Sequence, residues 1–400
     1  SSGTLNLATN NNDLTVFAGG IINQTGGAVT IRNLTINSAA APLAAGNLTF
    51  SGSTSNITGD LTNSGTATLN GGTVNIAGNI TNNASGDFTI GGAAVTSQND
   101  ATNFGIMSVS SGSLDLATAG KKLIIDGSTA TRGIFNQYAG SIVKTDNLEL
   151  KNNGTYNQFG GEVQIAHDLK VPAGSTFAAT GGTVNFTGSA GAGADYTGNV
   201  QFYNFKISSA GNPKINANET IKIAGNFVNE NTNLNVTSGI YIFNGTTPQT
   251  ITSAAPANTN KTLWDFRITN PAGVTLLSDL GVKAFSYTPP GYLNTNGKNF
   301  YVDGSIYTGP LPVELTSFSA SIIGSTVKLT WATATEVNNY GFEIERSQKL
   351  DARGDTWGKI GFVNGNGNSN SPKDYSFEDK TVAAGRYSYR LKQIDNDGQF

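Results

Sequence analysis

The sequence predicts an all-β protein in which a parallel β-helix, that is a three-sided β-solenoid, is followed by a β-sandwich. Three observations support this fold. Short runs of alternating apolar and polar residues recur along most of the chain, and Gly, Asn or Ser residues separate them. These runs group into units of about 20 residues, the length of one three-sided coil. After residue 309 the composition changes, and the runs there are spaced as in a sandwich.

The clearest repeat is a nine-residue phrase that occurs three times. It reads VNIAGNITN at 74–82, VQIAHDLKV at 163–171 and IKIAGNFVN at 221–229. Its first, third and seventh residues are apolar, which predicts a strand with one buried face, then a corner, then the start of another strand. We therefore expect the following side chains to point inward: Val74, Ile76, Val163, Ile165, Ile221 and Ile223. A unit of about 20 residues predicts about 15 coils before the sandwich.

The composition is typical of an extracellular β-protein. Only 13% of the 400 residues are charged, against about 25% in ordinary domains. There are 50 glycines and no cysteine, so disulfide bonds are excluded and stability must come from ladder hydrogen bonds and stacked apolar rows. The net charge of −3 argues against nucleic acid as a partner. No apolar run reaches the roughly 18 residues of a membrane span. A signal peptide is not recognisable, and we expect both ends to be cuts through a longer precursor.

Charge and pattern divide the chain into three predicted parts. Residues 1–190 carry the cleaner repeat and are predicted to form a regular β-solenoid. Residues 191–309 are predicted to form an irregular, aromatic-rich β-solenoid. Residues 310–400 hold ten Lys or Arg and eleven Asp or Glu residues, and Pro310 and Pro312 predict a stiff connector before them. Trp331 is the expected core tryptophan of this last part.

Four stretches of the last part resemble a known module: LPVELTSFSA, LTWATATEVNNYGFEIERS, GNGNSNSPKDYSF and YSYRLKQIDNDGQF. They are similar to the fibronectin type III-like module of secreted Bacteroidetes-type surface proteins. The resemblance implies a fibronectin type III-like β-sandwich and export by the type IX secretion system. GGTVNFTG and GIYIFNGTTPQTI are similar to the β-helical repeats of the same bacterial proteins. In that family the module continues past the DNDG turn into a last strand, so residues 310–400 are predicted to lack this strand.

No pattern predicts a catalytic, metal or cofactor site, and we expect that the protein is not an enzyme. His167 is the only histidine, and no cysteine is present to join it in a metal site. Acidic residues of the repeat region are scattered singly, whereas hydrolases and lyases need clustered Asp and Glu. The DNDG segment at 395–398 lacks the Glu that would close a calcium loop, so a hairpin turn is the simpler interpretation.

Two functions remain as predictions. The first is an extracellular structural protein, a filament or stalk on a bacterial cell surface that assembles head to tail from copies of itself. The alternative is a surface adhesin that binds glycans or other cells, with Trp264, Tyr287 and Tyr292 as the candidate glycan platform. Filling of a widening solenoid is the simpler interpretation of these aromatic residues.

The head-to-tail contact has candidate residues at both ends of the chain. A sandwich that lacks its last strand has an open edge, and open edges pair with other chains. Leu5 and Leu7, in the alternating segment 3–9, are expected to fill this groove by strand addition, with Phe400 on the sandwich side. Stacking on the first coil is the other contact that the sequence predicts.

Overall fold

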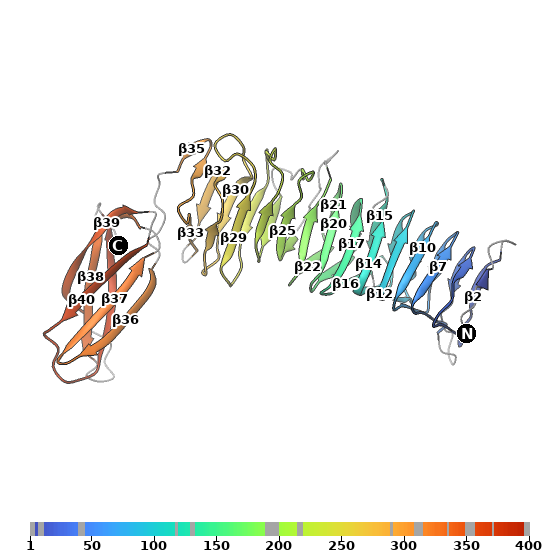
Figure 1. Cartoon of the computed structure of the whole chain (residues 1–400), viewed down its shortest axis with the longest axis horizontal. Coiled ribbons are helices and arrows are strands. Elements are labelled where there is room, and N and C mark those ends of the chain that lie inside the picture. The colour runs from blue at the N-terminus through green and yellow to red at the C-terminus, as the bar shows by residue number, and fades with distance from the viewer. Residues whose placement is uncertain are drawn as a thin grey trace.

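The computed structural model describes residues 5–6, 12–38, 45–116, 119–128, 133–188, 200–213, 219–288, 291–307, 315–333, 336–348, 357–369 and 372–395. Its regular structure consists of strands, and these residues contain no helix. The strands form a parallel β-solenoid of about 12 turns and two antiparallel sheets of three strands each (Figure 1). The predicted all-β class and the parallel β-solenoid are therefore confirmed.

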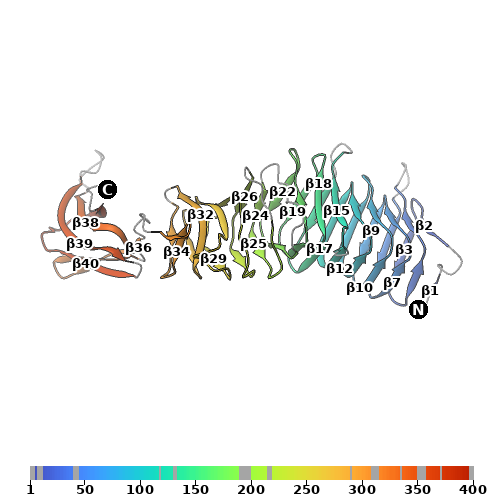
Figure 2. The same ribbon diagram turned by 90° about the horizontal axis from the view of Figure 1, so that it is seen from above.

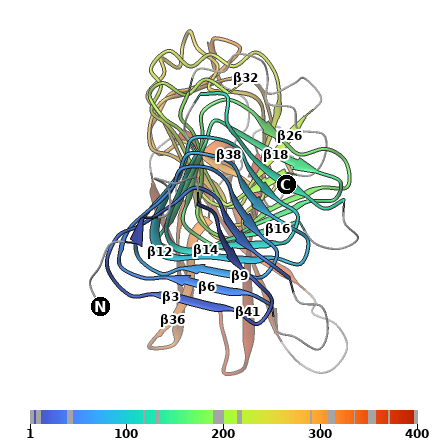
Figure 3. The ribbon, with the colours of Figure 1, turned by 90° about the vertical axis from the view of Figure 1, so that its right-hand side faces the viewer.

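Up to residue 186, each solenoid turn runs from face C to face B to face A, three ladders of parallel strands that stack along the axis (Figures 2 and 3). Face A consists of β1 (Leu5–Asn6), β4 (Val29–Ile31), β7 (Ser53–Ile57), β10 (Gly72–Ile76), β12 (Asp87–Ser97), β14 (Ile106–Leu116), β17 (Ser141–Thr145), β20 (Glu162–Ile165), β23 (Thr183–Phe186), β25 (Asn204–Ile207), β27 (Phe227–Asn229), β29 (Gln249–Ser253), β31 (Val274–Leu276) and β33 (Leu293–Asn294).

Face B consists of β3 (Ile21–Gln24), β6 (Asn47–Phe50), β9 (Thr66–Leu69), β16 (Ile134–Gln137), β19 (Thr155–Gln158), β22 (Thr176–Ala179), β24 (Val200–Phe202), β26 (Thr220–Ile223), β28 (Ile240–Phe243), β30 (Leu263–Ile268), β32 (Leu280–Tyr287) and β34 (Phe300–Val302). The long strands β12 and β14 cross the corner, so that their first halves belong to face B and join both faces into one sheet. A short strand, β35 (Ser305–Ile306), folds back antiparallel on β34.

Face C is a separate sheet of eight strands: β2 (Leu14–Val16), β5 (Leu34–Ile36), β8 (Leu61–Asn63), β11 (Ile80–Asn82), β13 (Ala101–Asn103), β15 (Lys122–Asp126), β18 (Asn147–Lys151) and β21 (Leu169–Lys170). Among the described residues after Lys170, no strand joins this sheet. The solenoid is therefore three-sided in strands up to β21 and has strands on two faces from β24 onward.

The inner side of every face is apolar because side chains alternate across each strand. Leu69 of β9 and Val74 of β10 are buried, and the residues beside them point outward. All six residues expected to point inward have no more than 1% of their surface exposed: Val74, Ile76, Val163, Ile165, Ile221 and Ile223. This prediction is confirmed.

The three copies of the phrase do not occupy equivalent faces, which the sequence alone did not predict. Val74 and Val163 lie on face A, and the strands after their corners lie on face C. Ile221 instead lies on face B, in register with Val200, and Phe227 after its corner lies on face A. The nine-residue repeat thus encodes a strand, a corner and a second strand, and it occurs at two different corners of the coil.

The expectation of about 15 coils is wrong, because several turns are longer than the 20-residue unit. Leu114 stacks on Val143, 29 residues later, and Ile251 stacks on Leu276, 25 residues later. The additional residues lie between strands and leave the ladder register intact. Insertions into such loops cost little, because the entropy of closing a loop rises slowly with its length.

The C-terminal part consists of two facing antiparallel sheets. The first has the order β36 (Leu315–Ile323), β37 (Thr326–Thr333) and β40 (Lys373–Asp379), and the second has the order β39 (Gly358–Ser369), β38 (Glu336–Gln348) and β41 (Tyr387–Asp395). Leu329, Trp331, Phe342 and Ile344 form their common core, so the predicted core tryptophan is confirmed. Pro310 and Pro312 of the predicted connector lie outside the described residues.

Candidate functional site: the outer surface of face C and its corners

The outer side of face C presents one side chain per turn in a continuous row. In the first five strands this residue is threonine, and the register aligns them: Thr15, Thr35, Thr62, Thr81 and Thr102. The row continues through Ile124, Glu149 and Lys170. It therefore changes along the axis from neutral hydroxyl groups to charged groups, and it forms an extended surface.

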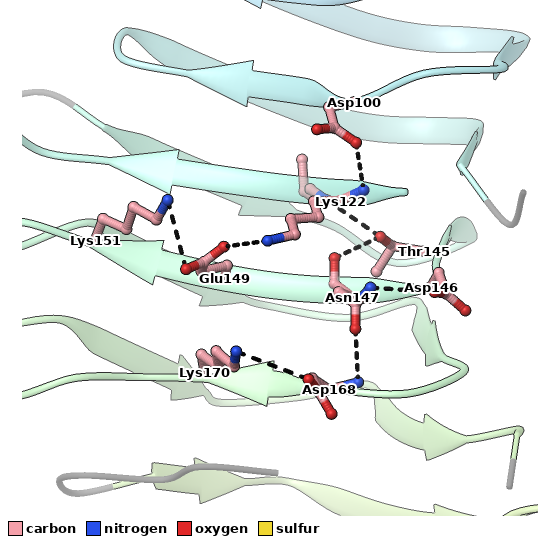
Figure 4. Close-up of polar contacts among 10 residues, drawn as sticks. Asp100, Lys122, Thr145, Asp146, Asn147, Glu149, Lys151, Asp168 and Lys170 are labelled. Carbon is pink, nitrogen blue, oxygen red and sulfur yellow. Dashed lines mark hydrogen bonds and ion pairs between the residues drawn. The ribbon is translucent and has the colours of Figure 1, made fainter. Parts of the chain in front are cut away.

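Ion pairs hold the charged part of this row (Figure 4). Lys122 Nζ lies 3.3 Å and Lys151 Nζ lies 3.5 Å from the Glu149 carboxylate. Lys170 Nζ lies 3.8 Å from Asp168. All three lysine side chains are exposed to solvent by about two fifths, so these pairs contribute little to the free energy of unfolding. Two carboxylates thus compensate most of the positive charge of the three lysines.

A row of Asp and Asn residues at the corner before face C joins several pairs of successive turns. Its side-chain oxygens accept the backbone N–H of the equivalent corner residue one turn later. The Oδ1···N pairs are Asp13 to Asn33 at 3.2 Å, Asn33 to Asp60 at 2.9 Å, Asp60 to Asn79 at 2.7 Å, Asp100 to Lys122 at 2.9 Å and Asn147 to Asp168 at 3.2 Å. We call this series the corner relay.

The backbone geometry of the corner explains how the relay forms. The Gly78 N–H donates to Gly59 O in the preceding turn, whereas the Ile80 N–H donates to Asp100 O in the following turn. The N–H of Asn79, between them, donates to the Asp60 side chain of the preceding turn. The Asn79 corner is exposed, so water also competes for this N–H, and the bond is worth no more than the roughly 0.5–1.5 kcal/mol of an ordinary hydrogen bond.

The same device recurs where the corner lies between faces B and A. Asn226 N donates to Asn204 Oδ1 at 2.8 Å, and Thr250 N donates to Asn226 Oδ1 at 2.8 Å. Near the end of the solenoid, Asn299 N donates to Asp279 Oδ1 at 2.9 Å. The relay is therefore a property of both solenoid parts.

A second row of asparagines lies inside the solenoid, at the end of the face C strands. Asn63, Asn82 and Asn103 are stacked in register and have no exposed surface. Asn63 Nδ2 donates to Asn82 Oδ1 at 2.8 Å, and Asn82 Nδ2 donates to Asn103 Oδ1 at 2.8 Å. The neighbours of this row in the turns before and after are Ile36 and Ile125. The same amides also bond the backbone: Asn63 Nδ2 donates to Asp87 O at 3.2 Å, Asn82 Nδ2 to Ile106 O at 2.9 Å and Asn103 Nδ2 to Ile134 O at 2.8 Å.

His167 pairs with a residue that the sequence reasoning missed. Its Nδ1 contacts Asp146 Oδ1, and Asp146 is buried. Asp146 Oδ2 also accepts the Gly120 N–H at 2.7 Å and the Asn147 amide at 3.1 Å. The signal in the sequence was the position of Asp146, at the corner one turn before His167. Three polar contacts around one corner indicate a structural role for Asp146.

The three residues of the predicted glycan platform do not lie together. Trp264 lies beside Lys283, whose Nζ is 6.0 Å from the centre of the Trp264 ring. Tyr287 follows Lys283 by four residues in the same strand, β32, and at the usual rise of a strand it lies about 13 Å from Lys283. Tyr292 donates its hydroxyl to Ala272 O at 3.1 Å in a different corner. Trp264 and Tyr287 pack with one side against the solenoid core.

An exposed aromatic pair lies instead at the corner between faces B and A. The rings of Tyr138 and Phe159 are stacked with their centres 5.2 Å apart, and both side chains are exposed. Because their faces are turned toward each other, the pair offers mainly ring edges to a ligand. It joins two turns and is a poor platform for a sugar ring.

The predicted interface residues fall mostly outside the described part. Leu7 and Phe400 lie outside the described residues. Leu5 lies in β1, in register with Val29 of β4. The backbone of the predicted donor segment therefore already pairs within its own solenoid at this point.

The sandwich holds two buried carboxylates with several hydrogen-bond donors each. Burial alone raises the pKa of Glu336, but hydrogen bonds from Tyr375 Oη, the Asn366 N–H and Thr333 Oγ1 outweigh it, so the pKa is lowered. Asp379 is buried likewise, and hydrogen bonds from Thr381 and Arg346 lower its pKa. Both carboxylates link the two sheets and stabilise the folded sandwich when they are charged.

Within the described ranges, no three His, Cys, Asp or Glu side chains are grouped so as to hold a metal ion. The same part of the chain has no helix with the length and apolarity to cross a membrane. Comparison with family models, curated proteins and solved structures finds no match.

We expect Asn82→Ala to lower the free energy of unfolding by about 1–3 kcal/mol, because Asn103 Oδ1 and the carbonyl oxygen of Ile106 lose the Asn82 amide in the interior. The triple variant N63L/N82L/N103L also leaves the Gly65 N–H without its side-chain acceptor. It should therefore be destabilised more than Asn82→Ala alone. Urea unfolding followed by circular dichroism measures both. A triple variant at least as stable as Asn82→Ala would contradict this role of the row.

Sandwich stability should fall as the pH drops below the ordinary glutamate value of 4.5. Because the folded pKa of Glu336 is lowered, its contribution is present above the unfolded pKa and is lost as the pH falls through the folded pKa. At about pH 7, Glu336→Gln should cost about 1–3 kcal/mol, and the difference from wild type should shrink toward pH 3. Urea unfolding followed by tryptophan fluorescence tests this.

The matched control for that experiment is Glu378→Gln, because Glu378 pairs with Lys380 at 3.5 Å on the exposed surface. It should change neither the stability nor its pH dependence. A cost of Glu336→Gln that is the same at pH 7 and pH 3 would refute the assignment.

Proposed function

We propose that this protein is an extracellular structural protein that forms a filament or stalk on a bacterial cell surface by head-to-tail self-assembly, without enzymatic activity. The resemblance of the last part to the fibronectin type III-like module of type IX secretion cargo supports the location. The ends of the solenoid and the sandwich support the assembly. The observation that carries the proposal is the exposed inner face of β36 in the described part of the sandwich.

The solenoid has the construction of a stiff rod. Its apolar core runs without interruption from Val16 to Phe300. The corner relay and the asparagine row add side-chain bonds between turns to the ladder bonds of the backbone. About 12 turns, at about 4.8 Å each, correspond to roughly 60 Å of rod.

The two ends of this rod differ. In the described part of the first turn, β2 and β3 each pair on one side only, and Phe17 and Ile21 are 69% and 70% exposed. At the other end, β35 covers the edge of β34, and Tyr307 packs against Phe285 and Phe300 with ring centres 5.5 Å apart. Among the described residues, the first turn thus offers an exposed apolar edge, which we call the head, whereas the face B edge of the last turn is covered by β35.

The sandwich offers a complementary surface, which we call the tail. Phe318 and Ile322 of β36 are in register with Trp331 and Val327, so they face the interior of the sandwich. They are nevertheless 36% and 82% exposed. Within the described residues, β41 is an edge strand that pairs with β38 alone. An apolar strip and an edge strand are features that accept an extended segment.

A head and a tail that differ in structure make a heterologous contact, and such contacts produce open chains when the rotation does not close. Two versions of the contact are available. In the first, residues 3–9 leave the solenoid and add to β41 as a donor strand. In the second, the intact first turn docks through Phe17 and Ile21. We favour docking, because it preserves the pairing of Leu5 with Val29.

We expect the wild-type protein to form fibres whose length rises with concentration. The head variant F17K/I21K and the tail variant I322K should each stay monomeric, because each places a charge in an apolar contact. A mixture of the two should form one-to-one dimers and stop there, because each partner keeps one working surface. Sedimentation velocity and negative-stain electron microscopy measure these states.

Leu277→Lys is the control for these variants, because Leu277 is exposed on the solenoid away from both surfaces, and it should form fibres normally. Deletion of residues 1–9 separates the two contacts: fibres persist if the first turn docks and are lost if the segment is a donor strand. Wild-type protein that stays monomeric at high concentration would overturn the proposed assembly.

A further inference from the structure

We propose that a groove on the outside of face A binds a neutral, linear polysaccharide along the solenoid axis. This inference does not rest on self-assembly. The groove has a volume of about 410 Å³ and crosses β4, β7, β10 and β12 near the corner that leads to face C. Its lining residues are Thr30, Asn56, Ile57, Thr58, Asn75, Ile76, Ala77, Thr96 and Gln98.

The lining carries hydroxyl and amide groups and no ionisable side chain. Both kinds of group donate and accept hydrogen bonds, which suits the hydroxyl groups of a sugar. Phosphate or another polyanion would require lysine or arginine in the lining. A groove of similar size on the sandwich contains Lys328 and Asp374 and therefore has a different chemistry.

The polar groups of the groove floor are held in fixed orientations. Thr96 Oγ1 donates to Asn75 Oδ1 at 2.9 Å, and Asn75 Nδ2 donates to Asn56 Oδ1 at 2.9 Å. These bonds use the amide oxygens and leave amide hydrogens to be donated outward. Groups that are already oriented lose less entropy when a ligand binds.

The regular spacing of the solenoid turns favours a polymeric ligand. Thr30, Asn56, Asn75 and Thr96 succeed one another in register, one per turn, at the strand spacing of about 4.8 Å. A ligand whose units repeat along its length can make the same contact at each turn. The side-chain methyl groups of Thr58 and Ala77, exposed on the corner side, provide an apolar contact for the C–H groups of each sugar ring.

The experiment uses the monomeric tail variant I322K as background, so that binding is scored without fibres. Cellohexaose, laminarihexaose and xylohexaose are titrated by isothermal calorimetry, with hexagalacturonate as an anionic comparison. At least one neutral hexasaccharide should bind, and more tightly than hexagalacturonate. Asn75→Ala should weaken this binding at least tenfold, and Ala77→Phe, which fills the groove, should abolish it.

Asn157→Ala is the matched control, because Asn157 Nδ2 donates to Asn136 Oδ1 at 3.0 Å in the same kind of outer row on face B. It should leave the affinity unchanged. Failure of all three neutral hexasaccharides to bind, tighter binding of hexagalacturonate, or equal losses for Asn75→Ala and Asn157→Ala would each overturn the proposal. Circular dichroism verifies that each variant is folded.

Discussion

The solenoid depends on how the backbone N–H groups at its corners are satisfied. At corners such as Asn79 the direction of the backbone hydrogen bonds reverses, and a side-chain oxygen of the preceding turn accepts the N–H, as Asp60 does for Asn79. At Asn147 the carbonyl oxygen of Lys121 accepts the N–H instead. The side-chain bonds reach from turn to turn and support the axial register. The Asp and Asn residues at these corners therefore supply acceptors where no backbone carbonyl does.

The relay also leaves the outer surfaces of the faces free to vary. Stability resides in the apolar core, the corner relay and the buried asparagine row, and none of these needs a particular outward residue. Face C accordingly changes from threonine to charged residues along its length, while its register continues from Leu14 to Lys170. A rod with such a surface suits a structural role, and it can carry a groove of defined chemistry on one face without loss of stability.

The sequence predicted the features that follow from local periodicity. Alternation identified the inward residues, such as Val74 and Ile221, and the position of Trp331 in the sandwich core. Alternation did not predict the features that depend on how the turns stack. The face on which residues 221–229 lie depends on the lengths of the corners elsewhere in the coil. Aromatic residues of the same aromatic-rich part of the sequence, such as Trp264 and Tyr287, are separated along two paired strands. Burial of Asp146 arises from the corner of the next turn, 21 residues away.

Amide hydrogen exchange at the corner tests the central claim most directly. Asp60→Ala removes the acceptor of the Asn79 N–H, whereas the neighbouring N–H groups of Gly78 and Ile80 keep their backbone acceptors, Gly59 O and Asp100 O. In nuclear magnetic resonance exchange measurements, the Asn79 amide should exchange at least tenfold faster in Asp60→Ala than in wild type. Gly78 and Ile80 should change much less, and Asp60→Asn should retain wild-type protection. Unchanged protection of Asn79 in Asp60→Ala would contradict the account.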